Sequence, residues 1–405
     1  MEPMVAGTLP DDLVVEILSW LPFKSFCRFK CVCKPWLAFS SNPNYHENLP
    51  KIPTGLFCQY EDLDKKSTKV IGQPRNVEQI DGALSFLPHY PQLQHMDCCN
   101  GLVLCMRRSM DWSNRKIICQ FIVCNPATRE WTKLPDTRPY QENGTCEAML
   151  VFNPSCSPRF YVLNFKRDPL TPFLSGLEVF SSNLSTWLVY EAWWNSGMPT
   201  LIGYPHLFID GSLYLFSLQR NSRRRILVLK GFEAMSPRVP PNRRTIKFPN
   251  DPSVESPDGL SVGMYTQGYF SQSMGALHYA LPEADGRAIW IWSLDVSGLD
   301  KWIVKCRLCL ADAFGRDDLS HYDSTQQSWN CGYRIAALDL ERDVVVFFDQ
   351  DNKLCSYAIS TGKLHELNDL EQDHEHGYDK FFYYVACYMK LPALVHLHQL
   401  HSSER

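Results

Sequence analysis

Between about residue 54 and residue 392 the sequence repeats one unit: an apolar run, a turn, a second apolar run, and then a Trp or charged residue before a break. Five such pairs of runs lie at 100–106 and 117–135, 159–165 and 176–193, 207–218 and 223–232, 275–281 and 287–308, and 343–348 and 353–367. The turns carry Gly with Asn, Asp or Ser, as in Asn100-Gly101, Asp210-Gly211 and Ser360-Thr361-Gly362. These residue types accept the positive φ of tight hairpin turns, so the runs are predicted to be strands.

The period of the repeat favours a β-propeller. Units of about 40–60 residues, each built from four strands, are typical of that fold. The final apolar run, 381–389, is predicted to pair with an early strand and close the ring, because closure removes exposed sheet edges. Trp290 and Trp292 alternate on a strand and are expected to pack between blades. The units have no kelch glycine doublet and no Trp-Asp signature, so a β-sandwich of hairpins is the alternative.

Residues 9–45 have a different, helical pattern. In LPDDLVVEILSWLP, Pro10 is tolerated in a first helical turn. Asp11 and Asp12 place negative charge near the positive, N-terminal end of the helix dipole, which stabilises a helix. Pro22 is expected to end it. On a helical wheel the apolar residues span about 220°, whereas a helix lying on one core needs a stripe of roughly 100°. These residues are Leu13, Val14, Val15, Ile17, Leu18, Trp20 and Leu21.

The next segment, FKSFCRFKCVCKPWLAF, continues this helical and apolar pattern. Three short helices in so few residues enclose little interior, and modules below about 40 residues rarely stand alone. We therefore expect a protein partner to bury the surplus apolar surface. The alternative is a helical hairpin packed only on its own chain.

The phrase LPDDLVVEILSWLPFKSFCRFKCVCKPW resembles the F-box motif in its plant form, although Trp20, Phe26 and Cys27 depart from the usual residues. The resemblance implies that this module binds a Skp-type adaptor, which in turn bridges to a cullin and a RING protein. Carried over by position, the adaptor-binding residues would be Leu9, Pro10, Leu13, Ile17, Leu18, Leu21, Pro22, Val32, Cys33 and Trp36.

The β-rich zone resembles the kelch-like and F-box-associated domains that follow plant F-boxes. CNGLVLC and VCNPATREWTKLP carry this resemblance, and in that family such domains hold protein substrates. The predicted fold is therefore an α+β multidomain chain, with a three-helix F-box ahead of an all-β propeller of about six blades. The expected divisions are a disordered N-terminus (1–8), the F-box (9–49), a linker (50–56), the propeller (57–392) and a C-terminal tail (393–405).

Composition narrows the class of partner. The net charge of −4 does not favour nucleic acid, and no apolar run is long enough to cross a membrane. The N-terminus lacks the pattern of a secretory signal, so we expect a protein of the cytoplasm and/or nucleus. In that compartment the 16 Cys are expected to be free, and those in apolar runs are expected to be buried: Cys105, Cys119, Cys124, Cys355 and Cys387.

The sequence contains none of the common phosphate-binding, nucleophile-elbow or zinc-protease motifs. Cys306-x-x-Cys309 lacks the second pair of ligands that a structural zinc site needs, so a buried thiol is the preferred interpretation. No catalytic residue, metal or cofactor is predicted, and the chain is not expected to be an enzyme.

Aromatic and basic residues near turns are the candidates for contact with an unknown protein substrate, since Trp, Tyr and Arg dominate interface hot spots. They are Trp193, Trp194, Arg223, Arg224, Trp329 and Tyr333. The Arg residues belong to a basic cluster that includes Arg220, Arg225, Arg243 and Arg244, which is either a solvated loop or an acidic docking site.

The favoured hypothesis is a non-catalytic subunit that links a target protein to a Skp–cullin–F-box ubiquitin ligase for proteasomal degradation. Two alternatives stay open at this point. One is an F-box protein that binds the adaptor without causing degradation. The other is an enzyme or small-molecule sensor that uses the propeller channel, which would require polar residues converging on the axis.

Overall fold

The computed structural model describes the main elements of the chain. The described residues are 10–21, 25, 54–62, 65–71, 79–111, 113–141, 145–154, 157–167, 174–190, 206–218, 224–249, 268–273, 276–283, 285–295, 300–316, 319–323, 328–349, 353–367, 378–392 and 394. Within them the chain forms one N-terminal helix, α1 (Asp11–Ser19), followed by a long succession of antiparallel strands.

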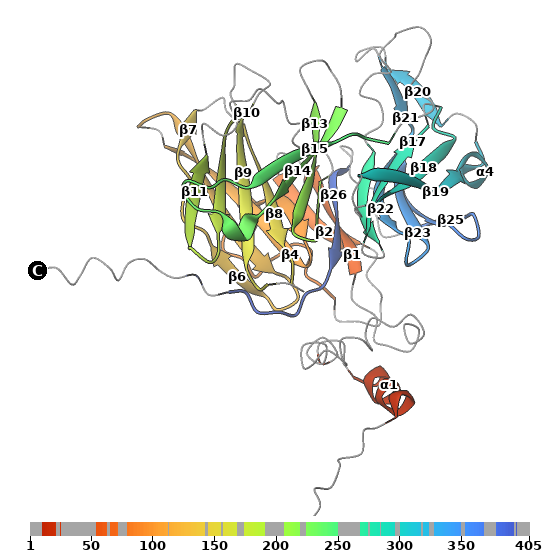
Figure 1. Ribbon diagram of the computed structural model, residues 1–405, viewed down its shortest axis with the longest axis horizontal. Coiled ribbons are helices and arrows are strands. Elements are labelled where there is room, and N and C mark those ends of the chain that lie inside the picture. The colour runs from red at the N-terminus through yellow and green to blue at the C-terminus, as the bar shows by residue number, and fades with distance from the viewer. Residues whose placement is uncertain are drawn as a thin grey trace, which may run out of the picture.

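The strands form six blades around a common axis (Figure 1). Blade 1 contains β3 (Gln94–Cys99), β4 (Leu102–Asp111), β5 (Lys116–Asn125) and β6 (Glu130–Lys133), with the short β7 (Tyr140–Gln141) beside β5. Blade 2 contains β8 (Thr145–Phe152), β9 (Phe160–Arg167), β10 (Leu174–Ser181) and β11 (Thr186–Tyr190). Blade 3 contains β12 (Leu207–Ile209), β13 (Ser212–Leu218), β14 (Arg224–Lys230) and β15 (Asn242–Ile246).

The second half of the ring follows the same plan. Blade 4 contains β16 (Tyr269–Ser273), β17 (Ala276–Pro282), β18 (Ala288–Asp295) and β19 (Lys301–Cys309). Blade 5 contains β22 (Tyr333–Asp339), β23 (Val344–Asp349), β24 (Leu354–Ala358) and β25 (Lys363–Glu366). Between them lie a one-turn helix, α4 (Ala311–Phe314), and a hairpin of β20 (Ser320–Asp323) and β21 (Ser328–Cys331).

Blade 6 joins the two ends of the β domain. The last strand, β26 (Tyr378–Val385), pairs antiparallel with the first, β1 (Thr54–Asp62), and β1 pairs with β2 (Lys65–Ile71). Leu56 stands opposite Tyr383 in this register. The predicted closure of the ring is confirmed, and so is the prediction of about six blades; the β-sandwich alternative is wrong. The innermost strands β22, β26 and β3 contact one another in turn around the axis.

Among the described residues, blade 6 has three strands where the other five blades have four or more. The segment 79–93, which includes a 3-10 turn (Tyr90–Gln92), follows β2 and lies against it. The Oγ1 of Thr68 on β2 donates a 2.9 Å hydrogen bond to the carbonyl of Gly82. A side chain at Gly82 would place its Cβ 2.3 Å from the backbone nitrogen of Val70, so only glycine allows this close approach.

The phrases CNGLVLC and CNPAT hold the chain end that follows β26. The side-chain amide of Asn125 is buried and donates to the carbonyls of Cys387 (2.7 Å) and Met389 (2.9 Å). Its Oδ1 accepts a hydrogen bond from the backbone N–H of Ala127. Gly101 lies so close to Cys387 that a side chain there would meet it at 2.4 Å. Both motifs therefore serve as a structural latch for residues 386–391.

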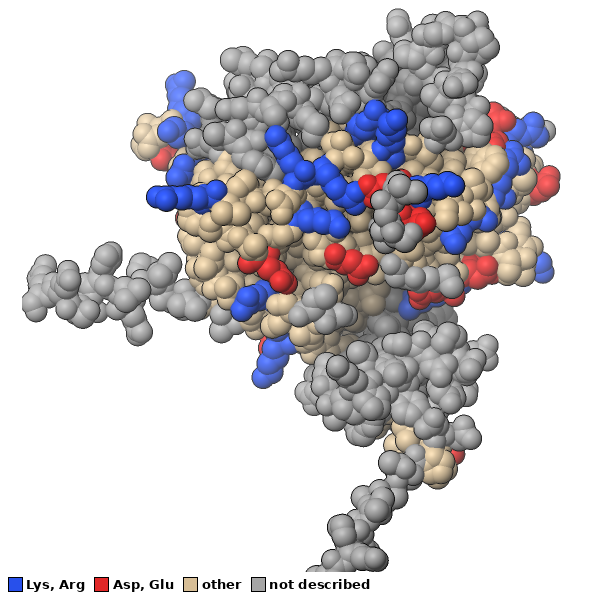
Figure 2. All heavy atoms as spheres, in the orientation of Figure 1, with Lys and Arg blue, Asp and Glu red and all other residues tan. Residues whose placement is uncertain are grey.

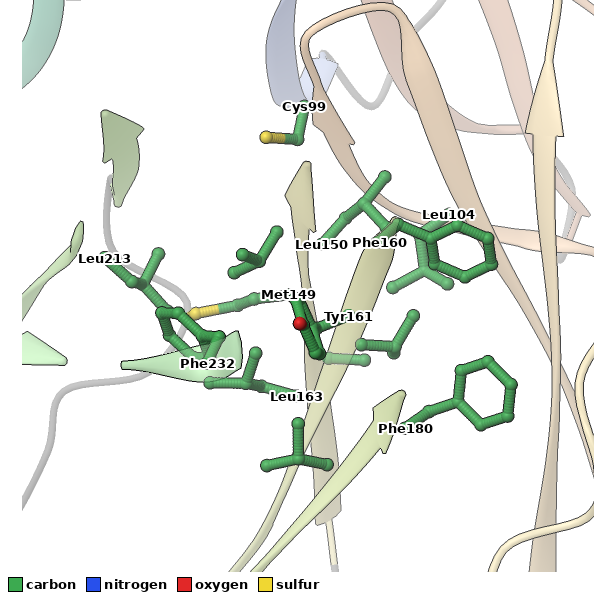
Figure 3. Close-up of a cluster of buried hydrophobic side chains, with 14 of the residues drawn as sticks. Cys99, Leu104, Met149, Leu150, Phe160, Tyr161, Leu163, Phe180, Leu213 and Phe232 are labelled. Atoms are coloured by element: carbon green, nitrogen blue, oxygen red, sulfur yellow. The ribbon is translucent and has the colours of Figure 1, made fainter. Parts of the chain in front are cut away.

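The core lies between the blades, where successive sheets face one another. Figure 3 shows the cluster around blade 2, in which Leu104 of blade 1, Phe160 of blade 2 and Leu213 of blade 3 belong to one continuous cluster of buried side chains. Each strand alternates its side chains between two blade faces, and both faces are covered on the inner strands, which therefore carry long apolar runs. Burying one such aromatic or aliphatic side chain contributes about 1.5–3 kcal/mol.

Two tryptophans join neighbouring blades by the same contact. Trp187 is the second residue of β11 and stands opposite Phe180, the next-to-last residue of β10. Its indole N–H donates to the carbonyl of Pro135 in blade 1 (2.8 Å). Trp302, the second residue of β19, stands opposite Leu294 in the same way and donates to the carbonyl of Lys247, after β15 of blade 3 (2.9 Å). In blades 2 and 4 the fourth-strand tryptophan is thus a blade-to-blade tie.

Several sequence predictions are confirmed at the level of strands and turns. Each of the five predicted pairs of runs falls within one of blades 1–5. Asn100-Gly101 and Asp210-Gly211 form hairpin turns in which both residues have positive φ. Trp292 is buried in a cluster shared by blades 3 and 4, and Trp290 is partly buried against it.

Other predictions needed adjustment. Strand β1 begins at Thr54, within the range expected for the linker (50–56), and β26 begins at Tyr378, ahead of the predicted final run 381–389. The five cysteines expected to be buried are buried, whereas Cys306 is partly buried and Cys309 is exposed. The second and third predicted helices of the N-terminal module, the 1–8 segment and most of the 393–405 tail lie outside the described residues.

Candidate functional site

Helix α1 is fixed by its sequence at both ends. Pro10 precedes the first turn, and its carbonyl accepts the backbone N–H groups of Leu13 and Val14. At the C-terminal end the N–H of Trp20 bonds to the carbonyl of Ile17, and that of Leu21 bonds to Leu18. The helix therefore ends at Ser19, and Trp20 is its C-terminal cap.

One side of α1 carries an apolar stripe that remains on the surface. Leu13 is 46% exposed, Ile17 52% and Trp20 80%. At 100° per residue these three positions fall on one face of the helix. Leu18, which points to another side, is only 1% exposed. Three large exposed apolar side chains on one short helix are characteristic of a protein-docking surface.

The predicted adaptor-binding residues divide into three groups. Leu13 and Ile17 lie on the exposed stripe, Pro10 is also exposed, and Leu21 is partly buried. Leu18 was expected to face a partner, but it is buried within its own chain and is not accessible in this structure. The remaining predicted residues lie outside the described part: Leu9, Pro22, Val32, Cys33 and Trp36.

Of the predicted substrate contacts, Tyr333 needs a correction. It was expected to be an exposed anchor at a blade rim, but it is only 4% exposed. Its hydroxyl donates a 2.8 Å hydrogen bond to the carbonyl of Gly286, and its ring packs on Phe314 and Phe347. Burial raises the pKa of this phenol, so the group stays neutral. Tyr333 is part of the core between blades 4 and 5.

The other predicted substrate contacts are not located in detail. Trp193, Trp194 and Arg223 lie outside the described residues. Arg224 is on β14 and Trp329 is on β21, but their side chains are not among those described. Arg243 and Arg244 are exposed on β15, where Arg244 forms an ion pair with Asp300.

Exposed Lys and Arg side chains form a band across one face of the propeller. Figure 2 shows them over the region where Figure 1 places β15 and β19. The exposed basic residues of these two strands and of the position after β15 are Arg243, Arg244, Lys247, Lys301, Lys305 and Arg307. We call this group the basic band.

Polar residues near the axis are used to tie blades together. Asp97 on β3 of blade 1 is buried, and its Oδ2 accepts the backbone N–H of Leu150 in blade 2 (2.6 Å). The same oxygen lies 2.8 Å from Nε2 of His206, at the start of blade 3. In blade 5, Asp339 accepts the hydroxyl of Tyr383 on β26 (2.9 Å). These carboxylates are thus engaged in contacts between blades.

A second candidate surface is a cleft on the side of blade 1, which sequence reasoning missed. Its cavity volume is about 360 Å³. Its walls include Trp131 of β6 and Leu93 of the 79–93 segment, and Arg107 and Lys133 reach it from β4 and β6. Trp131 is 44% exposed. The position of Trp131 in the sequence could have indicated this surface. Trp131 lies six residues after the end of the third strand of its blade, as Trp187 does in the next blade.

Within the described residues, no helix has the length and hydropathy required to cross a bilayer. In the same residues no three or more His, Cys, Asp or Glu side chains are grouped so as to hold a metal ion.

Comparison with known proteins identifies the N-terminal module. Residues 8–48 match the model of the F-box domain. F-box protein At5g07610 of Arabidopsis thaliana is 30% identical over 191 residues, which cover 44% of each chain. The F-box/kelch-repeat protein At3g17280 of the same plant is 32% identical over 138 residues, covering 32% of this chain and 33% of that protein. The match spans less than half the length of either relative.

Solved structures give only distant likenesses. Saccharomyces cerevisiae Sqt1 is 11% identical, with 77% of this chain and 67% of that chain covered and a TM-score of 0.32. Pyrococcus horikoshii acylaminoacyl peptidase is 10% identical, with coverage of 78% and 45% and a TM-score of 0.36. Likenesses this distant identify neither the fold nor the function of the chain. The assignment of the propeller rests on the strand order of the chain itself.

Proposed function

Because the chain carries an F-box domain ahead of a six-bladed β-propeller, we propose that it is a substrate-recognition subunit of a Skp–cullin–F-box ubiquitin ligase. In this proposal the F-box binds a Skp-type adaptor, and through it the cullin and the RING protein. The propeller binds a target protein and brings it to the ubiquitin-conjugating enzyme. The chain itself supplies no chemistry; it raises the effective concentration of the target at the reaction centre.

The observation that carries the proposal is the exposed apolar stripe of α1. Leu13 and Ile17 lie inside the matched F-box residues and stay about half exposed in the free chain. A partner that covers them would remove apolar surface from water, which favours association at roughly 25 cal/mol per Å². A carboxylate placed in that interface would be buried without a counter-ion.

The test is recovery of the adaptor from cells or from co-expression. Leu13→Asp and Ile17→Asp should each reduce co-purification of the Skp-type adaptor by at least about tenfold, since an unpaired charge at a hydrophobic interface costs several kcal/mol. Leu184→Asp is the matched control, because Leu184 is a leucine of nearly equal exposure (43%) in a blade 2 turn. Adaptor binding that survives both helix substitutions would refute the assignment of this face.

Cullin recovery separates the degradative role from an adaptor-bound role without degradation. If the chain is a ligase subunit, cullin and RING protein should co-purify with the adaptor, and the target should accumulate when the proteasome is inhibited. Recovery of the adaptor alone would favour the non-degradative alternative.

A further inference from the structure

Trp131 occupies the position of a blade-to-blade tie, but the neighbouring blade 6 has no fourth strand among the described residues. It is the second residue of β6 and stands opposite Cys124, the next-to-last residue of β5. Trp187 and Trp302 have the same register, and each donates its indole N–H to a carbonyl of the preceding blade. For Trp131 the preceding blade is blade 6, in which the described strands end at β2.

The result is an open aromatic side chain where blades 2 and 4 have a closed contact. Trp131 is 44% exposed, whereas Trp187 and Trp302 are partly buried. Among the described residues the indole N–H of Trp131 has no hydrogen-bond acceptor. Trp131 lines the cleft of about 360 Å³, together with Pro88 and Leu93 of the 79–93 segment.

The cleft combines an apolar interior with positive charge. Ile122 lies buried on β5, directly opposite Lys133 in the β5–β6 register, and Arg107 reaches the cleft from β4. The described residues that line the cleft include the two cations Arg107 and Lys133 and no carboxylate. Asp136 is 4.0 Å from Lys133, but both side chains are about half exposed, so water weakens that pair.

We propose that this cleft binds an extended segment of the target protein that carries an apolar side chain next to a carboxylate or phosphate group. The apolar side chain would pack on Trp131, whose indole N–H is available to a peptide carbonyl. The anionic group would contact Arg107 and Lys133; a guanidinium binds carboxylate and phosphate through paired hydrogen bonds. This inference rests on the proposed function and names the surface and the chemistry by which the propeller selects its target.

An alternative surface for an acidic segment is the basic band on β15 and β19. It offers exposed cations, but the indole N–H of Trp302, on the same strand β19, already donates to the carbonyl of Lys247 and is not available to a ligand. The band therefore provides the matched control for charge, because Lys301 and Lys305 also lie exposed on the fourth strand of a blade. If attraction between opposite charges were the whole effect, substitutions in the band would matter as much as those in the cleft.

The experiment measures binding of the full chain, purified with its adaptor, to an array of immobilised peptides. The central residue of each peptide is Asp, Glu, phosphoserine, Ala or Lys, with Leu, Phe or Ala placed nearby. We expect preference for an acidic or phosphorylated centre with an adjacent Leu or Phe. Trp131→Ala, Arg107→Glu and Lys133→Glu should each reduce that binding at least about tenfold, as is typical of interface hot spots.

The controls separate the cleft from charge and from folding. Lys301→Glu and Lys305→Glu should change binding less than about twofold, and Arg107→Glu should gain binding to the Lys-centred peptides. Trp187→Ala should lower the melting temperature and keep the peptide preference. Trp131→Ala should keep the melting temperature and lose the peptide preference. Absence of an acidic preference, or equal losses in the basic band and the cleft, would overturn the proposal. Adaptor recovery is scored on the same samples, so failure of the cleft and failure of the ligase role are read separately.

Discussion

Replacing Asn125 by Ala should loosen the closure of the propeller. The substitution removes an amide that donates to the carbonyls of Cys387 (2.7 Å) and Met389 (2.9 Å) and accepts the N–H of Ala127 (3.1 Å). Three hydrogen bonds are lost, and a typical buried one contributes about 1 kcal/mol, so the free energy of unfolding should fall by about 3 kcal/mol. The entropy of unfolding for roughly 340 residues is about 0.7 kcal/mol/K, which converts this loss to a decrease of about 4 °C in melting temperature.

The assay combines differential scanning calorimetry with hydrogen–deuterium exchange. Asn125→Ala should lower the melting temperature and should also speed exchange in the peptide that covers residues 386–392, because that segment loses its anchors. Asn183→Ala, an exposed asparagine in the corresponding turn of blade 2, is the control and should cost less than about 0.5 kcal/mol. An unchanged melting temperature, or unchanged exchange in 386–392, would refute the interpretation of Asn125 as a latch.

Two further predictions concern charge and thiol chemistry. Hydrogen bonds from Arg307 hold the pKa of Glu283 below its ordinary value of 4.5, so the carboxylate stabilises the fold above that pH and loses its effect as the pH falls through the lowered pKa. Glu283→Gln should therefore reduce the melting temperature at pH 7, with the difference shrinking towards pH 3; a pH-independent difference would contradict the pairing. Burial raises the pKa of Cys331 to about 12 and raises that of Cys99 further, whereas Cys309 is exposed. Among the described cysteines, brief alkylation of the native protein followed by mass spectrometry should modify Cys309 first, and rapid labelling of Cys99 would show that its site is not closed.

Local signals in the sequence were sufficient for strands, turns and the exposed helix. The Asn100-Gly101 turn needs positive φ at both residues, and the choice of residues reports that directly. The apolar surplus of the N-terminal segment predicted an exposed stripe, and Leu13 and Ile17 lie on one. The closure of the ring followed from the general need to cover sheet edges, which the final apolar run could satisfy.

Features that depend on which blades are neighbours could not be read from the sequence. Tyr333 follows turn-like residues, but its burial depends on Gly286, 47 residues away in another blade. Trp131 and Trp187 look alike in sequence, and only the smaller blade 6 leaves the first of them open. The NPAT phrase was recognised as a family feature, yet its role required knowing that Asn125 meets Cys387, 262 residues later.

The pairing of β26 with β1 has a consequence for synthesis of the protein. Of the described strands, β26, the innermost strand of blade 6, is the last to be synthesised, and its hydrogen-bonding neighbour β1 is the first. Roughly 320 residues separate them, so at about 5–20 residues per second β1 waits roughly 15–65 s for its partner. During that time the backbone edge of β1 at Leu56, Phe57 and Cys58 is unpaired and open to any other extended chain. We therefore expect chaperones that shield unpaired strands to bind the nascent chain.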